Sequence, residues 1–501
     1  MKKSMLSCLC FVLLLHFLLV LKVAAEVFCE SCLQVRVERP LVVRVGSHEP
    51  GLDTKFYVIK LSENLFRGYS SGGGDAYAIT GPEAWSMGWP ANKVLSKGAA
   101  GSYSECGVWI NSPVKIGDVY VAAVHQEQKC DYINGGQTHK SMGVSFSYDG
   151  LSWVNPITVL TSPEAPKMGT QSGEGDCSLV RAPDEGYLYM YCFRPGRWDN
   201  IVARAPEASY MFPSSWRKLY KGNWSEPAIG GMADSLGTIG SSVGYWRAGR
   251  KVIALDLDPW FGGIKLSLSS DYKNFFTLKD PLVPFVKNDW DRNLIGKSTD
   301  LIAYVGVVNL LGGGNRVDNS GWGITYTYIP HGGTLKEKYL VFQGVNMKVV
   351  SEPQQASVGL ALTRWEHRSG KYRVTTLPVV RQSEYTERNR IAYLLTRPVV
   401  GIETLEVEEC VNRQDPDDYL VTDAGGCDGS GHDRIATIGW VYKYPQKNTV
   451  PIYRCYSPLG ENHFLSSNAG CDDLGRRPQK LSATPDHFGK VLPHVLSRTQ
   501  R

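Results

Sequence analysis

Residues 147–153 read SYDGLSW and directly follow GVSF at 143–146, in which apolar and small residues alternate. An Asp-Gly pair between apolar runs is typical of a tight hairpin, because glycine tolerates positive φ and aspartate can bond its own backbone two residues on. A turn alone does not require Ser147 or Trp153. The stretch therefore predicts a hairpin whose remaining residues have a further role in packing.

A segment of this kind recurs along the chain. It consists of a short alternating strand, a polar turn that often carries an aromatic residue, and a strand of the type x-Val-Leu. The copies begin at Ala76, Gly143, Ile201, Ile264 and Ser357, with spacings of 67, 58, 63 and 93 residues. Five copies predict an all-β, five-bladed β-propeller over residues 55–400, with an ordinary β-sandwich as the alternative.

The stretch SYDGLSW resembles the Asp-box of sialidases and other β-propellers. The resemblance implies that Ser147 and Asp149 tie a hairpin at a blade corner and that Trp153 packs between sheets. Ser269 and Asp271 form a weaker copy of the same motif. We therefore expect Asp149 to be structural rather than catalytic.

The composition agrees with a turn-rich all-β chain, since 501 residues include 52 Gly, 26 Tyr and 13 Trp. The formal net charge is only +5, from 54 Lys and Arg against 49 Asp and Glu. No basic block or arm is present, so we expect no nucleic-acid partner.

The first 25 residues have the pattern of a secretory signal peptide. A positive start is followed by an apolar run and by the small residues Ala24 and Ala25. An uncleaved membrane anchor is the alternative, but Lys22 interrupts the run before it reaches a comfortable spanning length. We expect a secreted protein with no membrane partner after cleavage, and an N-terminal segment at residues 26–54.

Ten cysteines remain after cleavage, and they fall in neighbouring couples that favour local disulfides. The couples are Cys29 and Cys32, Cys106 and Cys130, Cys177 and Cys192, Cys410 and Cys427, and Cys455 and Cys471. Zinc is the alternative at Cys29-x-x-Cys32, although no second couple has suitable spacing. Asn223-Trp-Ser is a glycosylation sequon.

Residues 401–495 contain a duplicated pattern. The stretches that begin at Glu409 and Arg454 align, with Cys410 and Cys455 each followed nine residues later by an aromatic residue. We predict a small β-rich repeat domain stapled by Cys410–Cys427 and Cys455–Cys471. The second copy resembles an uncharacterised repeat of secreted proteins, which leaves open whether the module binds a polymer or a partner, or is a structural cap.

In a propeller, polar residues beside the innermost strands converge on one mouth of the central channel. The carboxylates beside apolar strands are Glu105, Glu174, Asp176, Glu226 and Asp300. His125 and Glu127 end the strand VAAV and could orient sugar hydroxyls or bind a cation in the channel. Trp224, Trp290 and Tyr103 could stack on sugar faces, although aromatic packing between blades is the commoner role.

The order of the motifs HQEQ, GVSFSYDGLSW, GEGDCSLV and WSEPAIGG resembles five-bladed glycoside hydrolases of the arabinanase and β-xylosidase type, over roughly residues 55–385. The resemblance implies an aspartate base, an aspartate that tunes a pKa and a glutamate acid. The matching positions here are Glu105, Asp176 and Glu226, and Glu105 departs from the pattern because aspartate is expected there. Inverting hydrolysis would need such an acid and base about 6.5–9.5 Å apart.

We therefore predict a secreted hydrolase-like protein that acts on an extracellular polysaccharide or glycan without a cofactor. Its catalytic residues would be Glu105, Asp176 and Glu226, and its substrate-binding residues would be His125, Glu127, Trp224 and Asp300. The alternative is a non-catalytic glycan-binding or matrix protein on the same scaffold. A sialidase is disfavoured, since that chemistry requires an arginine triad and a tyrosine nucleophile.

Overall fold

The computed structural model describes residues 29–45, 54–131, 137–182, 184–257, 263–284, 300–333, 337–351, 358–427, 431–446, 449–457, 460–468, 470–471 and 492–496. The predicted signal peptide at 1–25 lies outside these ranges. The described residues contain strands and three short 3-10 turns, η1 (Glu30–Cys32), η2 (Pro213–Ser215) and η3 (Gln382–Glu384). None of their helices has the length and apolar character needed to span a membrane.

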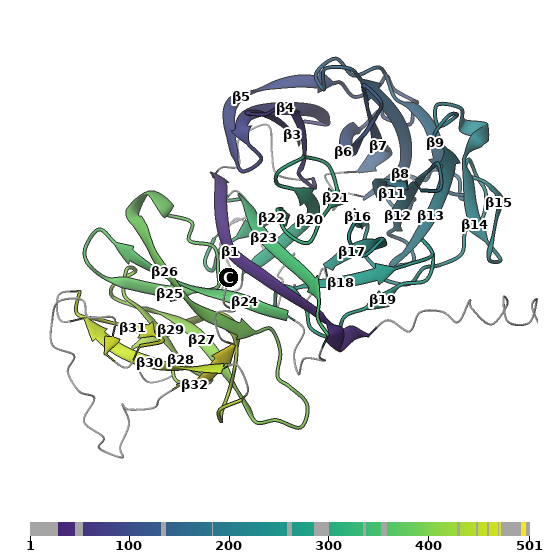
Figure 1. Ribbon diagram of the computed structural model, residues 1–501. Coiled ribbons are helices and arrows are strands. Elements are labelled where there is room, and N and C mark those ends of the chain that lie inside the picture. The colour runs from purple at the N-terminus through teal and green to yellow at the C-terminus, as the bar shows by residue number, and fades with distance from the viewer. Residues whose placement is uncertain are drawn as a thin grey trace, which may run out of the picture.

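Four separate, mainly antiparallel sheets follow one another along the chain (Figure 1). The first sheet contains β2 (Tyr57–Ser62), β3 (Leu65–Gly72), β4 (Asp75–Glu83) and β5 (Ser86–Leu95). The second contains β6 (Gly107–Ile116), β7 (Val119–Asp131), β8 (Gln137–Ser147), β9 (Ile157–Thr161) and β10 (Ser172–Gly173). The third contains β11 (Gly175–Ala182), β12 (Tyr187–Arg194), β13 (Asp199–Pro206), β14 (Arg217–Tyr220) and β15 (Asn223–Pro227). The fourth contains β16 (Ser242–Trp246), β17 (Lys251–Leu257), β18 (Ile264–Ser269), β19 (Phe276–Thr277) and β21 (Arg316–Val317).

The remaining strands form one 13-stranded sheet, called the large sheet below. Its first part contains β20 (Leu301–Asn309), β22 (Trp322–Ile329), β23 (Tyr339–Val349) and β1 (Leu33–Val45). Its second part contains β24 (Val358–His367), β25 (Tyr372–Thr375), β26 (Tyr385–Leu395), β27 (Thr404–Asn412), β28 (Tyr419–Asp423), β29 (His432–Tyr442), β30 (Thr449–Ser457), β31 (Asn462–Ser466) and β32 (Leu492–Leu496). The long strand β1 joins the two parts, because it pairs antiparallel with β23 and parallel with β24.

Serine hydroxyls connect the first strands of successive sheets. Ser112 Oγ of β6 accepts a hydrogen bond from the backbone of β11. Ser178 Oγ of β11 accepts one from Val243 N of β16 at 3.1 Å, and Ser242 Oγ accepts one from Val307 N of β20 at 3.2 Å. These strands therefore lie side by side around a common axis, which gives the propeller-like ring of sheets.

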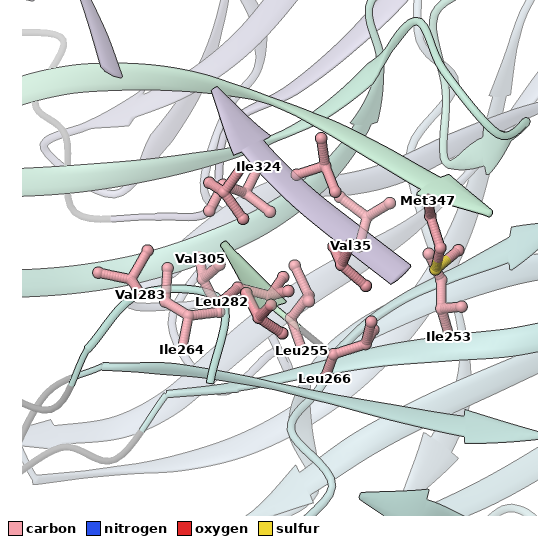
Figure 2. Close-up of a cluster of buried hydrophobic side chains, with 14 of the residues drawn as sticks. Val35, Ile253, Leu255, Ile264, Leu266, Leu282, Val283, Val305, Ile324 and Met347 are labelled. Carbon is pink, nitrogen blue, oxygen red and sulfur yellow. The ribbon is translucent and has the colours of Figure 1, made fainter. Parts of the chain in front are cut away.

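Apolar cores fill the spaces between neighbouring sheets. Separate buried clusters lie between the first and second sheets, the second and third, and the third and fourth. Another cluster joins the large sheet to the first sheet, through Phe342 and Phe66 among others. Figure 2 shows the cluster between the fourth sheet and the large sheet, where Val35 of β1 points towards Leu255 and Leu266. The ring is thus held together by apolar packing from sheet to sheet.

The hairpin at 147–153 has the structure that the sequence predicts. Asp149 Oδ1 accepts hydrogen bonds from Leu151 N at 2.8 Å and Ser152 N at 2.7 Å, and Ser147 Oγ accepts one from Gly150 N at 2.8 Å. These backbone N–H groups hold the pKa of Asp149 well below its usual range. Trp153 is buried edge-on against the Tyr69 ring of the first sheet, with centroids 5.7 Å apart. Asp149 therefore has a structural role.

Four of the five sequence copies occupy equivalent places. They fall on β4–β5, β8–β9, β13–β14 and β18–β19, each in a separate sheet. The fifth copy, from Ser357, falls on β24–β25, which lie beyond β1 in the large sheet. The strand that pairs with β23 on its far side is instead β1. The apolar residues of β1 are buried between the large sheet and the fourth sheet. The assignment of the fifth copy to a blade was therefore wrong.

The C-terminal part contains two stapled hairpins. Cys410 on β27 is bonded to Cys427, and Cys455 on β30 is bonded to Cys471, as predicted. The couples Cys29–Cys32, Cys106–Cys130 and Cys177–Cys192 are also disulfides, so the zinc alternative at Cys29 and Cys32 is wrong. The buried core of this part also includes Leu362 and Ile391 of β24 and β26, so its packing extends back across residue 400.

Candidate functional site

A cavity of about 390 Å³ lies where the first strands of the ring begin. Lys55 precedes β2, Trp109 is near the start of β6, and Asp176 is the second residue of β11. Ser242 begins β16, and Tyr304 lies in the first half of β20. All four separate sheets and the large sheet therefore contribute to this cavity, at one mouth of the channel.

Asp176 is surrounded by cationic and imidazole groups in the cavity. Its Oδ2 atom lies 2.6 Å from Lys140 Nζ, and its Oδ1 atom lies 3.7 Å from His125 Nδ1. Burial alone would raise the pKa of Asp176, but Lys140, His125 and Lys55 together hold it well below its usual range. The side chain is 36% exposed, so an ionised carboxylate faces the cavity.

Lys55 reaches the same acid from the first sheet. Its Nζ atom donates to the backbone oxygen of Asp176 at 2.5 Å and to Ser241 Oγ at 2.6 Å. Burial lowers the pKa of Lys55 to about 8, with Asp176 acting in the opposite direction. Lys55 therefore ties the first, third and fourth sheets together at the floor of the cavity, and its charge can change in mildly alkaline solution.

His125 is held in one tautomer by its two partners. Its Nδ1 atom accepts a hydrogen bond from Asp176 N at 2.9 Å, so the proton of the neutral ring lies on Nε2. Nε2 lies 3.1 Å from Glu127 Oε1 and donates to it. The imidazole therefore links the carboxylate of Glu127 to the backbone N–H of Asp176.

The backbone around the cavity is unusual. Asp176, Trp198 and Tyr304 have φ of 53°, 52° and 54°, in the left-handed region that non-glycine residues seldom occupy. Gly175 is required for close approach, since a Cβ there would lie 2.8 Å from His125 Cε1. Such strain persists where the surroundings hold it and is frequent at functional sites.

Aromatic side chains form much of the remaining wall. Trp109 packs against His125 with ring centroids 5.2 Å apart, and Trp198 packs against Phe193 at 5.3 Å. Trp198 is 51% exposed, so one large aromatic surface remains open to a ligand. The cavity thus combines aromatic surfaces with convergent charged groups, a combination typical of small-molecule and sugar sites.

Three of the predicted site residues meet in this cavity, namely His125, Glu127 and Asp176. Glu105 does not line it. Its carboxylate accepts hydrogen bonds from Lys129 N at 2.8 Å and Gly101 N at 2.6 Å, and these lower its pKa. Glu105 therefore caps the loop before β6.

Glu226 and Trp224 lie on β15, the outermost strand of the third sheet. Glu226 is paired in register with Lys218 of β14 and does not line the cavity. Trp224 packs under the guanidinium of Arg204, 4.4 Å from its ring centroid. The prediction that Glu226 and Glu105 meet Asp176 at one mouth is not met, because the motif WSEPAIGG forms an outer strand rather than an inner one.

The other predicted residues also lie elsewhere. Asp300 is buried just before β20, in a separate small cavity with Tyr326 and Tyr328, and burial raises its pKa to about 7. Tyr103 is exposed, away from the cavity lining. Trp290 lies outside the described residues. Asn223 is exposed, and its glycosylation stays a prediction.

Sequence reasoning missed Lys55, Lys140, Trp109 and Trp198. Lys55, Lys140 and Trp109 could have been predicted as site residues, because they lie in or near apolar runs such as FYVI and GVSF that predict strands. Trp198 carries no such signal, because it lies in the turn between β12 and β13.

No family model and no curated protein matches the sequence. Solved structures are similar to the chain at low identity. A family 117 glycoside hydrolase produced by the marine bacterium Zobellia galactanivorans has 10% identity and a TM-score of 0.40, over 65% of this chain and 93% of that one. An α-L-arabinofuranosidase from Lactobacillus brevis has 9% identity and a TM-score of 0.38, over 58% and 90%. An N-acetylgalactosamine deacetylase from F. plautii has 10% identity and a TM-score of 0.36, over 60% and 92%.

Proposed function

We propose that the protein binds a glycan in the cavity at the mouth of the channel and acts as an extracellular carbohydrate-binding protein. The observation that carries this proposal is the lining of the cavity. Lys140, Asp176 and Glu127 offer charged hydrogen-bonding groups, and Trp198 offers an exposed aromatic face. The charged groups can form hydrogen bonds with sugar hydroxyls, and the indole can stack on the apolar face of a pyranose ring.

Binding fits the geometry better than hydrolysis by the three carboxylates that the sequence predicts. Hydrolysis needs a protonated carboxyl beside the bond and an ionised one across the sugar ring. Asp176 is held ionised by Lys140, His125 and Lys55, so it suits hydrogen-bond acceptance. Glu226, the predicted proton donor, lies on an outer strand.

The experiment is a screen of the purified mature chain against a panel of soluble and insoluble polysaccharides. It records both retention of the protein and release of reducing ends. We expect retention on at least one glycan class, with affinity lowered about tenfold or more by Trp198→Ala. Phe212→Ala is the matched control, because Phe212 is an exposed aromatic residue outside the cavity, in the connection between β13 and β14.

Two results would overturn the proposal. Retention that is unchanged by Trp198→Ala and by Asp176→Asn would show that the cavity does not hold the sugar. Release of reducing ends that Asp176→Asn abolishes would instead establish a hydrolase, with a proton donor other than Glu226.

We also propose that β20, β22, β23 and β1 complete the ring as a fifth blade. Val307 of β20 bonds Ser242 of the fourth sheet, and Thr325 Oγ1 of β22 donates to Phe56 O beside the first sheet at 3.0 Å. The five disulfides support the proposal that the chain is secreted. The shared core of β24, β26 and the C-terminal strands supports a second unit that begins before residue 400.

A further inference from the structure

A second group of chemically active side chains lies far along the chain from the cavity. His367 ends β24, Glu384 belongs to η3, and Asp417 lies in the loop between β27 and β28. One ligand atom of each lies within 4.8 Å of the others. Three segments that are distant in sequence therefore bring an imidazole and two carboxylates to one point.

The imidazole of His367 is buried, with only 6% of its side chain exposed. Its Nε2 atom has no hydrogen-bond partner among the described residues, although it faces both carboxylates. Nε2 lies 3.5 Å from Glu384 Oε2 and 4.0 Å from Asp417 Oδ2. Two ligands of a tetrahedral ion with bonds of about 2.0–2.1 Å lie about 3.3 Å apart. The distances here are somewhat longer, so the two carboxylates would draw in towards Nε2 around an ion.

The surrounding contacts would orient these ligands. Nδ1 of His367 lies 2.7 Å from Ser369 Oγ and 3.3 Å from Ser369 N, which donates to it. Metal binding through Nε2 therefore requires the tautomer in which Nδ1 carries the proton and donates it to Ser369 Oγ. Arg381 contacts Oδ1 of Asp417, whereas Oδ2 is the oxygen 4.0 Å from His367. Arg381 also lies 3.2 Å from Glu384 Oε2. Because Glu384 Oε2 is also the oxygen nearest His367, Arg381 would have to leave it when an ion binds, and its 41% exposure gives it room to move into solvent.

The local charge also favours a cation. Four carboxylates gather here, Glu384, Asp415, Asp417 and Asp418, and Asp415 is paired with Lys371. Besides this pair, Arg381 pairs with both Asp417 and Glu384. One arginine thus serves two of the proposed ligands, and a cation between them would add positive charge where two carboxylates meet.

We propose that His367 Nε2, Glu384 and Asp417 bind one divalent transition-metal ion of the zinc type. Imidazole nitrogen with carboxylate oxygen suits zinc and its neighbours, whereas calcium and magnesium prefer oxygen alone. The ion would fasten the β27–β28 loop to the end of β24. The site is separate from the channel cavity, so the proposal does not depend on glycan binding.

The test uses the mature chain without a histidine tag, first treated with chelator and then dialysed against Zn²⁺. We expect one zinc per chain by elemental analysis and a rise in the thermal midpoint. His367→Gln and Asp417→Asn should each weaken zinc binding at least about tenfold. Asp433→Asn is the control, because Asp433 pairs with Arg413 on the exposed surface of the same unit, and it should bind like the parent chain.

A second measurement needs no variant. Co²⁺ bound to the parent chain should show visible absorption bands of a low-coordinate site, and Zn²⁺ should remove them. Absence of stoichiometric zinc in the parent chain would overturn the proposal, and so would zinc binding that His367→Gln leaves unchanged. A thermal midpoint that responds to pH but not to zinc would assign the cluster to an imidazolium ion pair instead.

Discussion

Glu174 and Lys218 show how burial acts on single charged residues in this protein. Both side chains are almost completely buried, and Lys218 Nζ lies 2.7 Å from Glu174 Oε2. Lys218 also donates to Thr161 O and Gly231 O. Burial raises the pKa of Glu174 to about 7 in spite of the nearby ammonium group. The backbone oxygens around Lys218 fix the position of this ion pair. Removing either charged group would leave the other buried without its partner.

Lys218→Met should lower the free energy of unfolding by about 3–5 kcal/mol, because it leaves a buried carboxylate without its partner. Urea unfolding at pH 7.5 measures the change. The double variant Lys218→Met with Glu174→Gln should recover part of the loss, since no charge then remains buried. A single variant as stable as the parent chain would contradict this account.

Asp300 predicts a dependence of stability on pH. Burial raises its folded pKa from 3.8 to about 7, so the folded state binds more protons than the unfolded state between about pH 4 and pH 7. Its contribution to stability therefore falls as pH rises through that window and stays unfavourable above pH 7. Asp300→Asn should stabilise the protein at pH 8, by up to about 4 kcal/mol, and much less at pH 4.5. Equal effects at both pH values, measured by chemical unfolding, would contradict the raised pKa.

At the scale of elements, the 147–153 turn lies in the connection between β8 and β9 and carries Trp153 to the first sheet. Asp149 organises the turn by accepting several backbone hydrogen bonds, as an N-cap does in a helix. The hairpin therefore couples local turn chemistry to packing between sheets.

Asp149→Ala should lower the unfolding free energy by about 1–2 kcal/mol, by analogy with loss of a helix cap. The folded pKa of Asp149 is lowered, so its contribution is present above the ordinary carboxyl pKa and is lost as pH falls through the folded value. Thermal unfolding at neutral pH measures the effect. Asp118→Ala, in the turn between β6 and β7, is the comparison and should change stability by much less.

At the scale of the whole molecule, β1 holds the two parts of the large sheet together. It pairs with β23 on one side and β24 on the other (Figure 1), and its own residues Val35 and Val37 are fully buried. A strand from the N-terminal part of the chain therefore closes against strands that follow it by 294 residues or more, since Val45 pairs with Tyr339 and Leu33 with Val349.

Val35→Asp should prevent stable folding of both parts, because a carboxylate would enter the core shown in Figure 2. The milder Val35→Ala should lower stability by about 1–3 kcal/mol and keep a single unfolding transition. Calorimetry and limited proteolysis measure both variants. Early unfolding of the C-terminal strands alone in Val35→Ala would show that β1 does not couple the two parts.

The sequence by itself determined the features that rest on local pattern. Alternation and turn residues predict the outer hairpins of four sheets, the Asp-box predicts the tied turn, and the spacing of cysteines predicts the staples at Cys410 and Cys455. Each of these depends on residues that are close in sequence. Asp176, His125 and Glu127 were also found, since they adjoin apolar runs that the pattern reveals. His125 and Glu127 do not end their strand as expected, because β7 continues past them to Asp131.

Only the tertiary structure decided which strands are innermost and which residues share a site. Glu226 follows the same local pattern as a channel residue, but pairing with β14 places it at the outer edge. The placement of β1 beside β23 also depends on apolar residues far apart in sequence, which no local pattern reports. Lys55, Lys140 and Trp198 meet because the ring brings separate sheets to one mouth, and His367, Glu384 and Asp417 meet for the same reason in the second part. Periodicity specifies the faces of a strand, whereas long-range burial selects its neighbours.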